Sequence, residues 1–298
     1  MAKTFNFYRA VEILKKEFAY YSLLALAFLT LAYFSAREEL TLKPPNLVVS
    51  IFILLVLFLV SFALWVRLPA RRNLIRECFI LVLGAFGIFV LYPVMIDWLA
   101  RVGWIKLVWR EFPPFRIFGE AFSYLLSIAI ALLVMYFGYR KDLLVRYFLR
   151  IEIHLKDLVA IFLLLGVTII FLLLWFKLGA TGKESWSTLG LGFAGAIILG
   201  VISSIGNAFA EEFWFRGFFL GTFSRLTSAG LANFMQAVLF GFIHFKDGIP
   251  QGASGWVLAG IWGLILGYWT LLRLSLASAL ILHLLTDLFI YFYVNGLL

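Results

Sequence analysis

Long apolar runs are the feature that most constrains how this chain can fold. A helix that crosses a bilayer needs about 20 consecutive apolar residues, and runs of that kind recur along the 298 residues. Only 14% of the residues are charged, against about 25% in soluble domains. We therefore predict an all-α polytopic membrane protein, a bundle of eight or nine transmembrane helices. The predicted spans lie near residues 18–35, 46–66, 78–99, 120–139, 157–178, 190–223, 231–246, 253–272 and 276–295.

The positive charge of the chain fits loops at a membrane surface. The formal net charge is +9, and the Lys and Arg residues form short clusters between the apolar runs. Such loops lie against anionic headgroups, and no module for nucleic-acid recognition accompanies the charge. His154 falls in one of these basic loops and is expected to be solvated. The distribution of basic residues over alternate loops favours a cytoplasmic N-terminus, in a multi-pass protein of a prokaryotic plasma membrane.

The chain divides into two parts that differ in where the charges lie. Up to about residue 180 the charged residues are almost confined to loops, whereas the later part places ionisable residues inside apolar runs. The turn-rich polar stretch from Gly179 to Thr188 is the predicted boundary. We expect residues 1–180 to form a scaffold of transmembrane helices and residues 181–298 to carry the functional site.

Two glutamates and an arginine interrupt one apolar run, at Glu211, Glu212 and Arg216. A charge near the middle of a membrane helix costs roughly 2.5–3.5 kcal/mol. Two adjacent carboxylates are therefore expected there only if they have a structural or functional role. If the run is one α-helix, residues four apart share a face, and Arg216 pairs with Glu212 while Glu211 is left unpaired. Glu211 is then the candidate general base. The alternative is that both glutamates only bind Arg216 or mark a loop at the membrane surface.

Two of the three histidines also lie in apolar runs. His244 lies near the end of one, and His283 lies one helical turn before Asp287 in the last. Asn207, one turn before Glu211, is a candidate for a supporting hydrogen bond or for ordinary packing. A lone histidine in a membrane helix is usually a packing element, but ionisable groups on three helices are expected to turn inward and meet.

Three short motifs contain most of these residues. They are Glu211-Glu212-Phe-Trp-Phe-Arg216, Phe240-Gly-Phe-Ile-His244 and His283-Leu-Leu-Thr-Asp287. In order and spacing they resemble the EExxxR, FxxxH and HxxxN or HxxxD motifs of the CPBP family, also called Abi, of intramembrane glutamic endopeptidases that process CAAX proteins and bacteriocins. The resemblance covers about residues 190–295 and implies a catalytic core of helices with a cavity opening into the bilayer. It also implies that residues 1–180 are variable N-terminal transmembrane helices.

The resemblance also implies roles for individual residues. Those that match Glu211 and His244 activate a water for attack on a peptide carbonyl, and those that match His283 and Asp287 stabilise the oxyanion. Glu212 has a supporting role, and no cofactor is implied. The implied substrate is a membrane-associated protein or peptide: a CAAX-type prenylated protein, or a leader or bacteriocin-like peptide.

Asp287 departs from the commonest family pattern, because CAAX endopeptidases usually carry Asn at this position. An ionised aspartate cannot donate a hydrogen bond to an oxyanion and repels it. Either Asp287 is protonated, or it orients His283, which then serves the oxyanion alone. We favour the second interpretation. The departure also leaves open that the chain is not a protease.

Three other functions compete with peptide hydrolysis. Histidines and carboxylates are the ligands of catalytic zinc, so a divalent metal site assembled from separate helices is one alternative. A non-catalytic membrane scaffold or immunity protein with the same fold is the second. A secondary transporter is the third, since buried Glu, His and Asp also build proton relays, although the charges here are concentrated in one half of the chain rather than in inverted repeats.

Overall fold

A computed structural model describes the second half of the chain and short pieces before it. The described residues are 76–77, 80–84, 87–88, 113–138, 153, 155–177, 192–246, 249 and 252–298. The spans expected near 18–35 and 46–66, most of the span near 78–99, the boundary at 179–188 and His154 lie outside them. The predicted division of the chain at about residue 180 therefore stays a prediction.

The elements with assigned bounds are all helices, and no strand occurs in the described part of the chain. They are α6 (Pro113–Gly138), α8 (Leu155–Lys177), α9 (Phe193–Glu211), η5 (Glu212–Phe219), α10 (Leu220–Leu226), α11 (Ala229–Lys246), α12 (Gly252–Arg273) and α13 (Ala277–Val294). Five helical segments of the described chain are long and apolar enough to cross a membrane: 117–136, 155–177, 193–226, 252–273 and 277–294. They confirm the all-α class and match five of the predicted spans. The apolar stretch of α11, Ala229–Phe245, is shorter.

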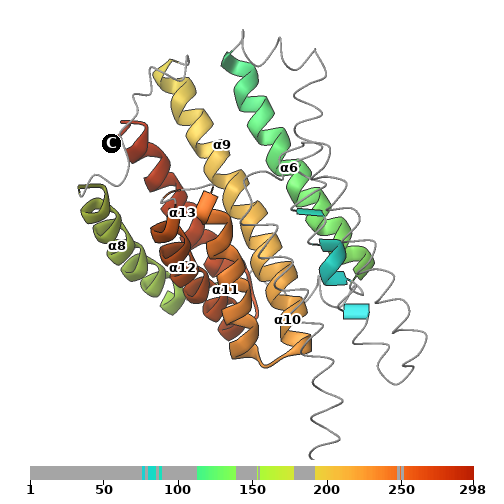
Figure 1. The fold of residues 1–298 in the computed structure, drawn as a ribbon. Helices are drawn as coiled ribbons and strands as arrows, with labels where there is room; N and C mark the ends of the chain where they lie inside the picture. The colour runs from blue at the N-terminus through green and yellow to red at the C-terminus, as the bar shows by residue number, and fades with distance from the viewer. Residues whose placement is uncertain are drawn as a thin grey trace, which may run out of the picture.

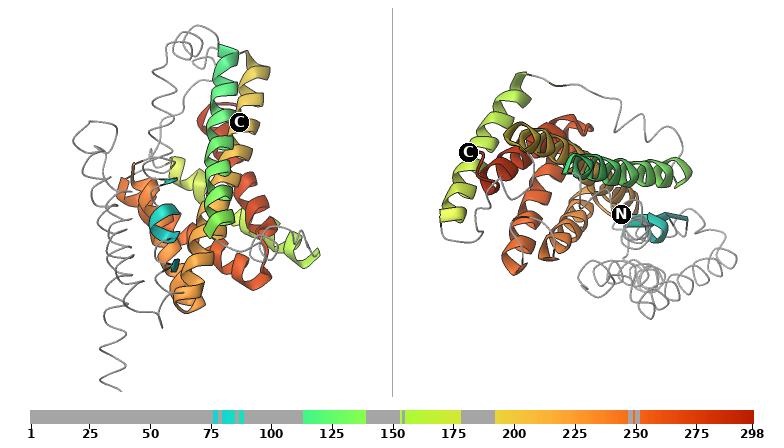
Figure 2. Two further views of the ribbon diagram at one scale, coloured as in Figure 1. Left: turned by 90° about the vertical axis from the view of Figure 1, so that its right-hand side faces the viewer. Right: turned by 90° about the horizontal axis from the view of Figure 1, so that it is seen from above.

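One continuous helix runs through the middle of the bundle. α9, η5 and α10 follow one another without a break from Phe193 to Leu226, and α6 lies alongside α9 while α11, α12 and α13 lie on its other side (Figures 1 and 2). The prediction assumed a single α-helix here. The structure instead has a π-helix over Glu212–Phe219, and π-helical segments inside α-helices are frequent at functional sites.

The π-helix is anchored by aromatic packing. The rings of Trp214, Phe215, Phe218, Phe219 and Phe223 are all buried and contact one another in edge-to-face, tilted or stacked geometry. Packing of this area of ring removes a large apolar surface from the surroundings. The start of the π-helix, and with it Glu212, is therefore held in a rigid core.

Small residues let α11 and α12 approach closely, as the spacing of Ala259, Gly263 and Gly267 indicates. A Cβ on Gly263 would lie 3.1 Å from a ring carbon of Phe240, and a Cβ on Gly267 would collide with the side chain of Asn233. The side-chain amide of Gln236 donates to the backbone carbonyl of Gly263 over 2.8 Å, which joins the two helices. This contact holds α11, which contains the motif from Phe240 to His244, against α12.

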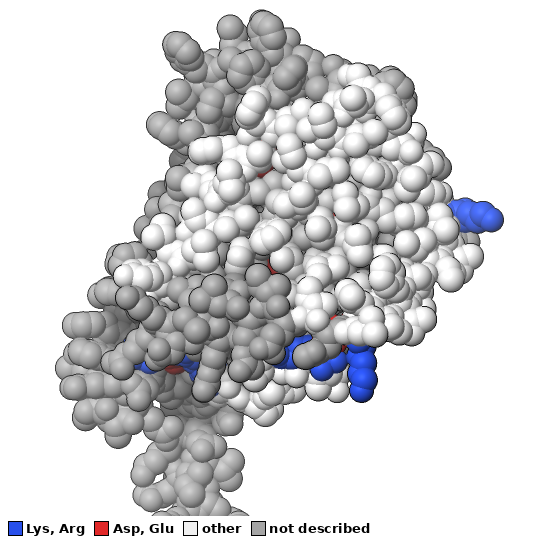
Figure 3. Space-filling view, turned by 180° about the vertical axis from the view of Figure 1, so that it is seen from behind, with Lys and Arg blue, Asp and Glu red and all other residues white. Residues whose placement is uncertain are grey.

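The outer surface of the bundle is apolar. On α8, Phe162, Leu163, Val167 and Ile170 are each more than 60% exposed. Figure 3 shows one face on which the described surface is almost uncharged across its middle, with Lys and Arg toward the lower part and a further basic side chain at the right-hand edge. An extended apolar surface of this kind is suited to contact with lipid rather than water.

Candidate active site

His283 lies between two carboxylates from the central helix. Its Nδ1 is 2.7 Å from Oε1 of Glu212, and its Nε2 is 3.3 Å from Oε2 of Glu211. The change from α-helix to π-helix occurs between the two glutamates, so they can flank one imidazole although they are adjacent in sequence. The α-helical spacing predicted that Glu211 has no partner. The structure instead places Glu211 against His283 of α13, a helix that the spacing argument did not include.

Arg216 pairs with Glu212, as predicted. Its Nη1 is 2.9 Å from Oε1 of Glu212, and both side chains are almost completely buried. The guanidinium also lies 4.4 Å from the centre of the Phe240 ring, in cation–π geometry. The same Glu212 oxygen thus contacts both Arg216 and His283. Glu212 connects a permanent cation to the imidazole of the site.

Asp287 and Asn207 form the other side of the cluster. Nδ2 of Asn207 donates to Oδ2 of Asp287 over 3.1 Å, joining α9 to α13. Oδ1 of Asp287 is 3.6 Å from Nε2 of His283, which is too long for a hydrogen bond. The bond that orients the His283 ring comes from Glu212, so the structure corrects our interpretation that Asp287 has this role. A hydrogen bond between residues 80 apart in sequence could not be identified from helical spacing.

His244 approaches the cluster from α11. Its Nδ1 is 3.0 Å from the backbone carbonyl oxygen of Phe240, which accepts a hydrogen bond from a protonated Nδ1, so that Nε2 of the neutral ring carries the lone pair. His244 and His283 line the same pocket. His244 on α11 thus reaches the same pocket as the histidine of α13 that contacts Glu211.

Phe240 connects these groups. Its ring centre is 4.7 Å from that of His244 and 6.0 Å from that of His283, which it meets edge to face. It also carries the cation–π contact with Arg216. The sequence analysis quoted Phe240 as a motif residue without a role. The only sequence signal for Phe240 was its position in the FxxxH motif. In the structure its ring packs between Arg216 and the two site histidines.

A pocket of about 360 Å³ lies beside the cluster. His244, His283 and Asp287 line one side of it, and residues of α8, including Val167 and Phe171, line another. The other lining side chains are mostly apolar and come mainly from α8, α12 and α13, with Phe240 of α11 and Ile249. A pocket of this size with a few convergent polar groups is typical of a ligand site.

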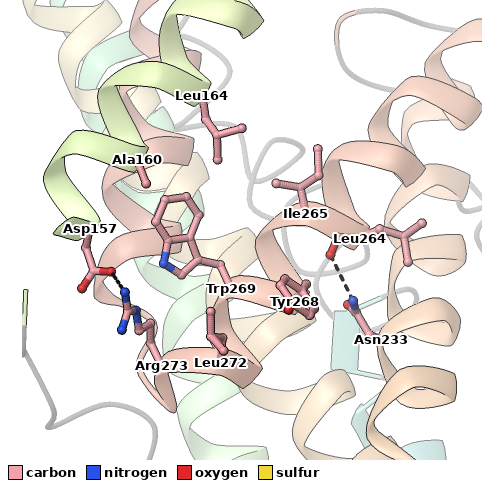
Figure 4. A pocket seen from close by; sticks show the side chains of 10 residues that line it. All are labelled: Asp157, Ala160, Leu164, Asn233, Leu264, Ile265, Tyr268, Trp269, Leu272 and Arg273. Atoms are coloured by element: carbon pink, nitrogen blue, oxygen red, sulfur yellow. Dashed lines mark hydrogen bonds and ion pairs between the residues drawn. The ribbon is translucent and has the colours of Figure 1, made fainter.

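A second pocket, of about 530 Å³, adjoins the first along the seam between α8 and α12. Both pockets are lined by Leu164 and Ile265. Figure 4 shows the second pocket, with Trp269 and Tyr268 projecting from α12 and the ion pair of Asp157 with Arg273 at one end. The ion pair joins the first turn of α8 to the last turn of α12. The pocket beside it is mainly apolar.

The metal alternative can be compared with the described side chains. Among them, no group of three or more His, Cys, Asp or Glu residues has an arrangement that could hold a metal ion. Glu211, Glu212, His283 and Asp287 are close together, but the imidazole nitrogens face the carboxylates directly.

The chain was compared with known protein families, curated proteins and solved structures. Residues 192–289 match the family model described as "Type II CAAX prenyl endopeptidase Rce1-like", and this range contains all three motifs. No curated protein matches, and neither does any solved structure. The family match confirms the resemblance that the three motifs predict. Over residues 192–289, this integral, multi-pass membrane protein is similar to the Rce1-like type II CAAX prenyl endopeptidases.

Proposed function

We propose that this protein is an intramembrane endopeptidase of the glutamic type, with residues 181–298 as its catalytic core. Its reaction is hydrolysis of a peptide bond near the C-terminus, or in a membrane segment, of a membrane-associated protein or peptide. The observation that carries the proposal is that His244 of α11 and His283 and Asp287 of α13 line one pocket, while Glu211 of α9 contacts His283. The family match over residues 192–289 supports the same reaction class.

In this mechanism Glu211 is the general base. It retains an exposed fraction of 16% in its side chain, so a water molecule can reach it. Glu211 accepts one proton from that water while the water oxygen adds to the substrate carbonyl carbon, with His244 holding the water from the other side. The charge moves to the carbonyl oxygen. When the intermediate collapses and the C–N bond breaks, the proton passes from Glu211 to the leaving nitrogen.

Glu212 supports this chemistry through His283. It binds the imidazole at Nδ1 and is itself held by Arg216, so the ring presents Nε2 toward Glu211 in one fixed orientation. Because the His283 ring is already ordered in the folded protein, no free energy is needed to order it during the reaction. Glu212 and Arg216 therefore act as positioning residues.

The pocket described above is, in this proposal, the predicted substrate cavity that opens into the bilayer. Its apolar walls suit a hydrocarbon or apolar side chains. The substrates that remain in consideration are prenylated CAAX-type proteins and unprenylated leader or bacteriocin-like peptides. We also propose a prokaryotic plasma membrane as its location, with the N-terminus in the cytoplasm; the distribution of basic residues supports that orientation.

The test is cleavage of a library of prenylated and unprenylated membrane peptides by the purified, full-length protein. The native chain is compared with Glu211→Ala and His244→Ala, each with and without chelator. Glu120→Ala is the matched control, because Glu120 is also a carboxylate in a membrane span but bonds to Ser203 rather than to the cluster. All variants are first compared by thermal unfolding to establish that they are folded.

We expect cleavage that resists chelator, is lost in Glu211→Ala and His244→Ala, and is retained in Glu120→Ala. Loss of a general base lowers the rate by about 10²–10⁴-fold. Cleavage that chelator abolishes and added metal restores would support a divalent metal site instead. A folded native protein that cleaves no peptide of either kind would favour a non-catalytic scaffold or immunity protein.

A further inference from the structure

The hydrogen bond between Asn207 and Asp287 places an amide and a carboxylate at the edge of the site. Asn207 lies on α9 four residues before Glu211, so the two share a face of that helix. Asp287 lies on α13 and lines the pocket. The hydrogen bond, at 3.1 Å, therefore joins a pocket-lining carboxylate to an amide one helical turn from the candidate base.

Hydrolysis of a peptide bond requires a hydrogen-bond donor for the oxygen that becomes negative. An ionised Asp287 can only accept hydrogen bonds. Arg216 is completely buried and directed at Glu212 and the Phe240 ring. Nδ1 of His283 is bound by Glu212, and its Nε2 lies 3.3 Å from Oε2 of Glu211, the candidate base. His283 and Arg216 thus direct their donors at carboxylates, and an ionised Asp287 has no donor.

The amide of Asn207 supplies what the others lack. Its nitrogen carries two hydrogens, and the bond to Asp287 uses one of them. A carboxylate is a strong acceptor, so Asp287 fixes the plane of the amide and thereby the direction of the second N–H. The donor is also neutral, and it adds no further charge to a membrane-buried cluster where an unbalanced charge is costly.

We propose that Asn207 donates the hydrogen bond that stabilises the oxyanion, and that Asp287 is the residue that positions it. The inference rests on the proposed endopeptidase function and names a catalytic residue for it. In this arrangement α9 carries the donor and α13 carries its acceptor. The amide is thus present at the site, on the neighbouring helix rather than at position 287.

The proposal predicts that the amide donor can be moved from position 207 to position 287. Asn207→Ala removes it, and the expected loss in kcat is about 10²–10³-fold, with KM nearly unchanged because the contact forms in the transition state. Asn207→Asp, which leaves two carboxylates, is expected to lose at least as much. Asp287→Asn keeps the donor on α9 and provides a new carbonyl acceptor, so its kcat is expected to fall by less than about tenfold.

The deciding variant is the exchange of the two side chains, Asn207→Asp with Asp287→Asn. It restores one amide and one carboxylate and returns the donor to the site from α13. We expect it to recover at least about tenfold of the kcat lost in Asn207→Asp. Asn295→Ala is the matched control, because it also removes an amide hydrogen bond, to the Tyr291 carbonyl, but at the C-terminal end of α13. This control is expected to keep its kcat.

The measurements are kcat and KM for a peptide that the native chain cleaves, together with thermal unfolding of each variant. Recovery in the exchanged variant supports the proposal, because a purely structural defect at Asn207 would not be repaired by a second change in the chemistry of position 287. Full kcat in Asn207→Ala overturns it, as does a folded exchanged variant without recovery or a folded Asp287→Asn without activity. In these cases the native chain still cleaves, so the endopeptidase function survives. A native chain that cleaves nothing removes both.

Discussion

The ion pair of Glu212 with Arg216 allows a quantitative test of how the site is held together. Both side chains are almost completely buried, and their charged atoms are 2.9 Å apart. Arg216→Met keeps the length of the side chain but removes the cation. Glu212 is then buried with His283 as its remaining partner. Removing one member of a buried pair costs about 3–5 kcal/mol, mainly because the other charge remains buried.

A second change should repair most of this loss. Glu212→Gln with Arg216→Met removes both charges, and the glutamine oxygen can still accept a hydrogen bond from Nδ1 of His283. Exchanging a charged acceptor for a neutral one at that bond costs on the order of 1 kcal/mol. We therefore expect the double variant to be more stable than Arg216→Met by about 2 kcal/mol or more.

The assay is thermal unfolding of the purified variants in detergent, followed by tryptophan fluorescence. At about 2–4 °C for each kcal/mol, Arg216→Met should unfold roughly 6–20 °C below the native protein. Arg225→Met is the matched control, because Arg225 pairs with Glu77 but its side chain is 32% exposed. Glu77 is buried but keeps Arg76 as a partner at 2.9 Å, so the loss of the partly exposed Arg225 leaves no unpaired buried charge and is expected to cost only about 0–1 kcal/mol. The reasoning is refuted if Arg216→Met unfolds at the temperature of this control, or if the double variant is the less stable one.

Three further outcomes can be measured with the same protein. Phe240→Leu removes the ring that contacts Arg216 and both site histidines; we expect kcat to fall about tenfold or more while stability falls by only about 1–2 kcal/mol, and an unchanged kcat would contradict this. Gly267→Leu should destabilise the protein by about 1–3 kcal/mol by overpacking, whereas Gly230→Leu, where an added Cβ meets no atom within 4 Å, should not. Phe171→Ala enlarges the pocket from the α8 side, so we expect KM for bulky apolar substrates to change several-fold; a change of the same size in Phe162→Ala, which is not a lining residue, would exclude a specific effect.

Much of the helical framework could be predicted from local sequence. A membrane span is set by the length of an apolar run, because every backbone polar group in lipid must be satisfied within the helix. The spans expected near 157–178, 253–272 and 276–295 are found as α8, α12 and α13. The pairing of Glu212 with Arg216 was predictable for a similar reason, since it joins residues only four apart.

The contacts inside the site depend on how helices cross, and these could not be predicted in detail. Glu211 meets His283 and Asn207 meets Asp287 across α9 and α13. The spacing within one helix carries no information about such contacts, so Glu211 was wrongly expected to have no partner. The π-helix was also missed, because its start depends on the burial of Trp214 and its neighbouring rings against other helices.

The sequence alone thus determined the class of protein, the described spans and the residues that would be costly in a membrane, because each of these follows from composition and local spacing. The tertiary structure decided which of those residues touch. It placed Glu212, rather than Asp287, against the Nδ1 of His283, and it placed the Phe240 ring among Arg216 and the histidines. The physical reason is that burial forces charged groups to find partners, but only the packing of whole helices selects which partner each one finds.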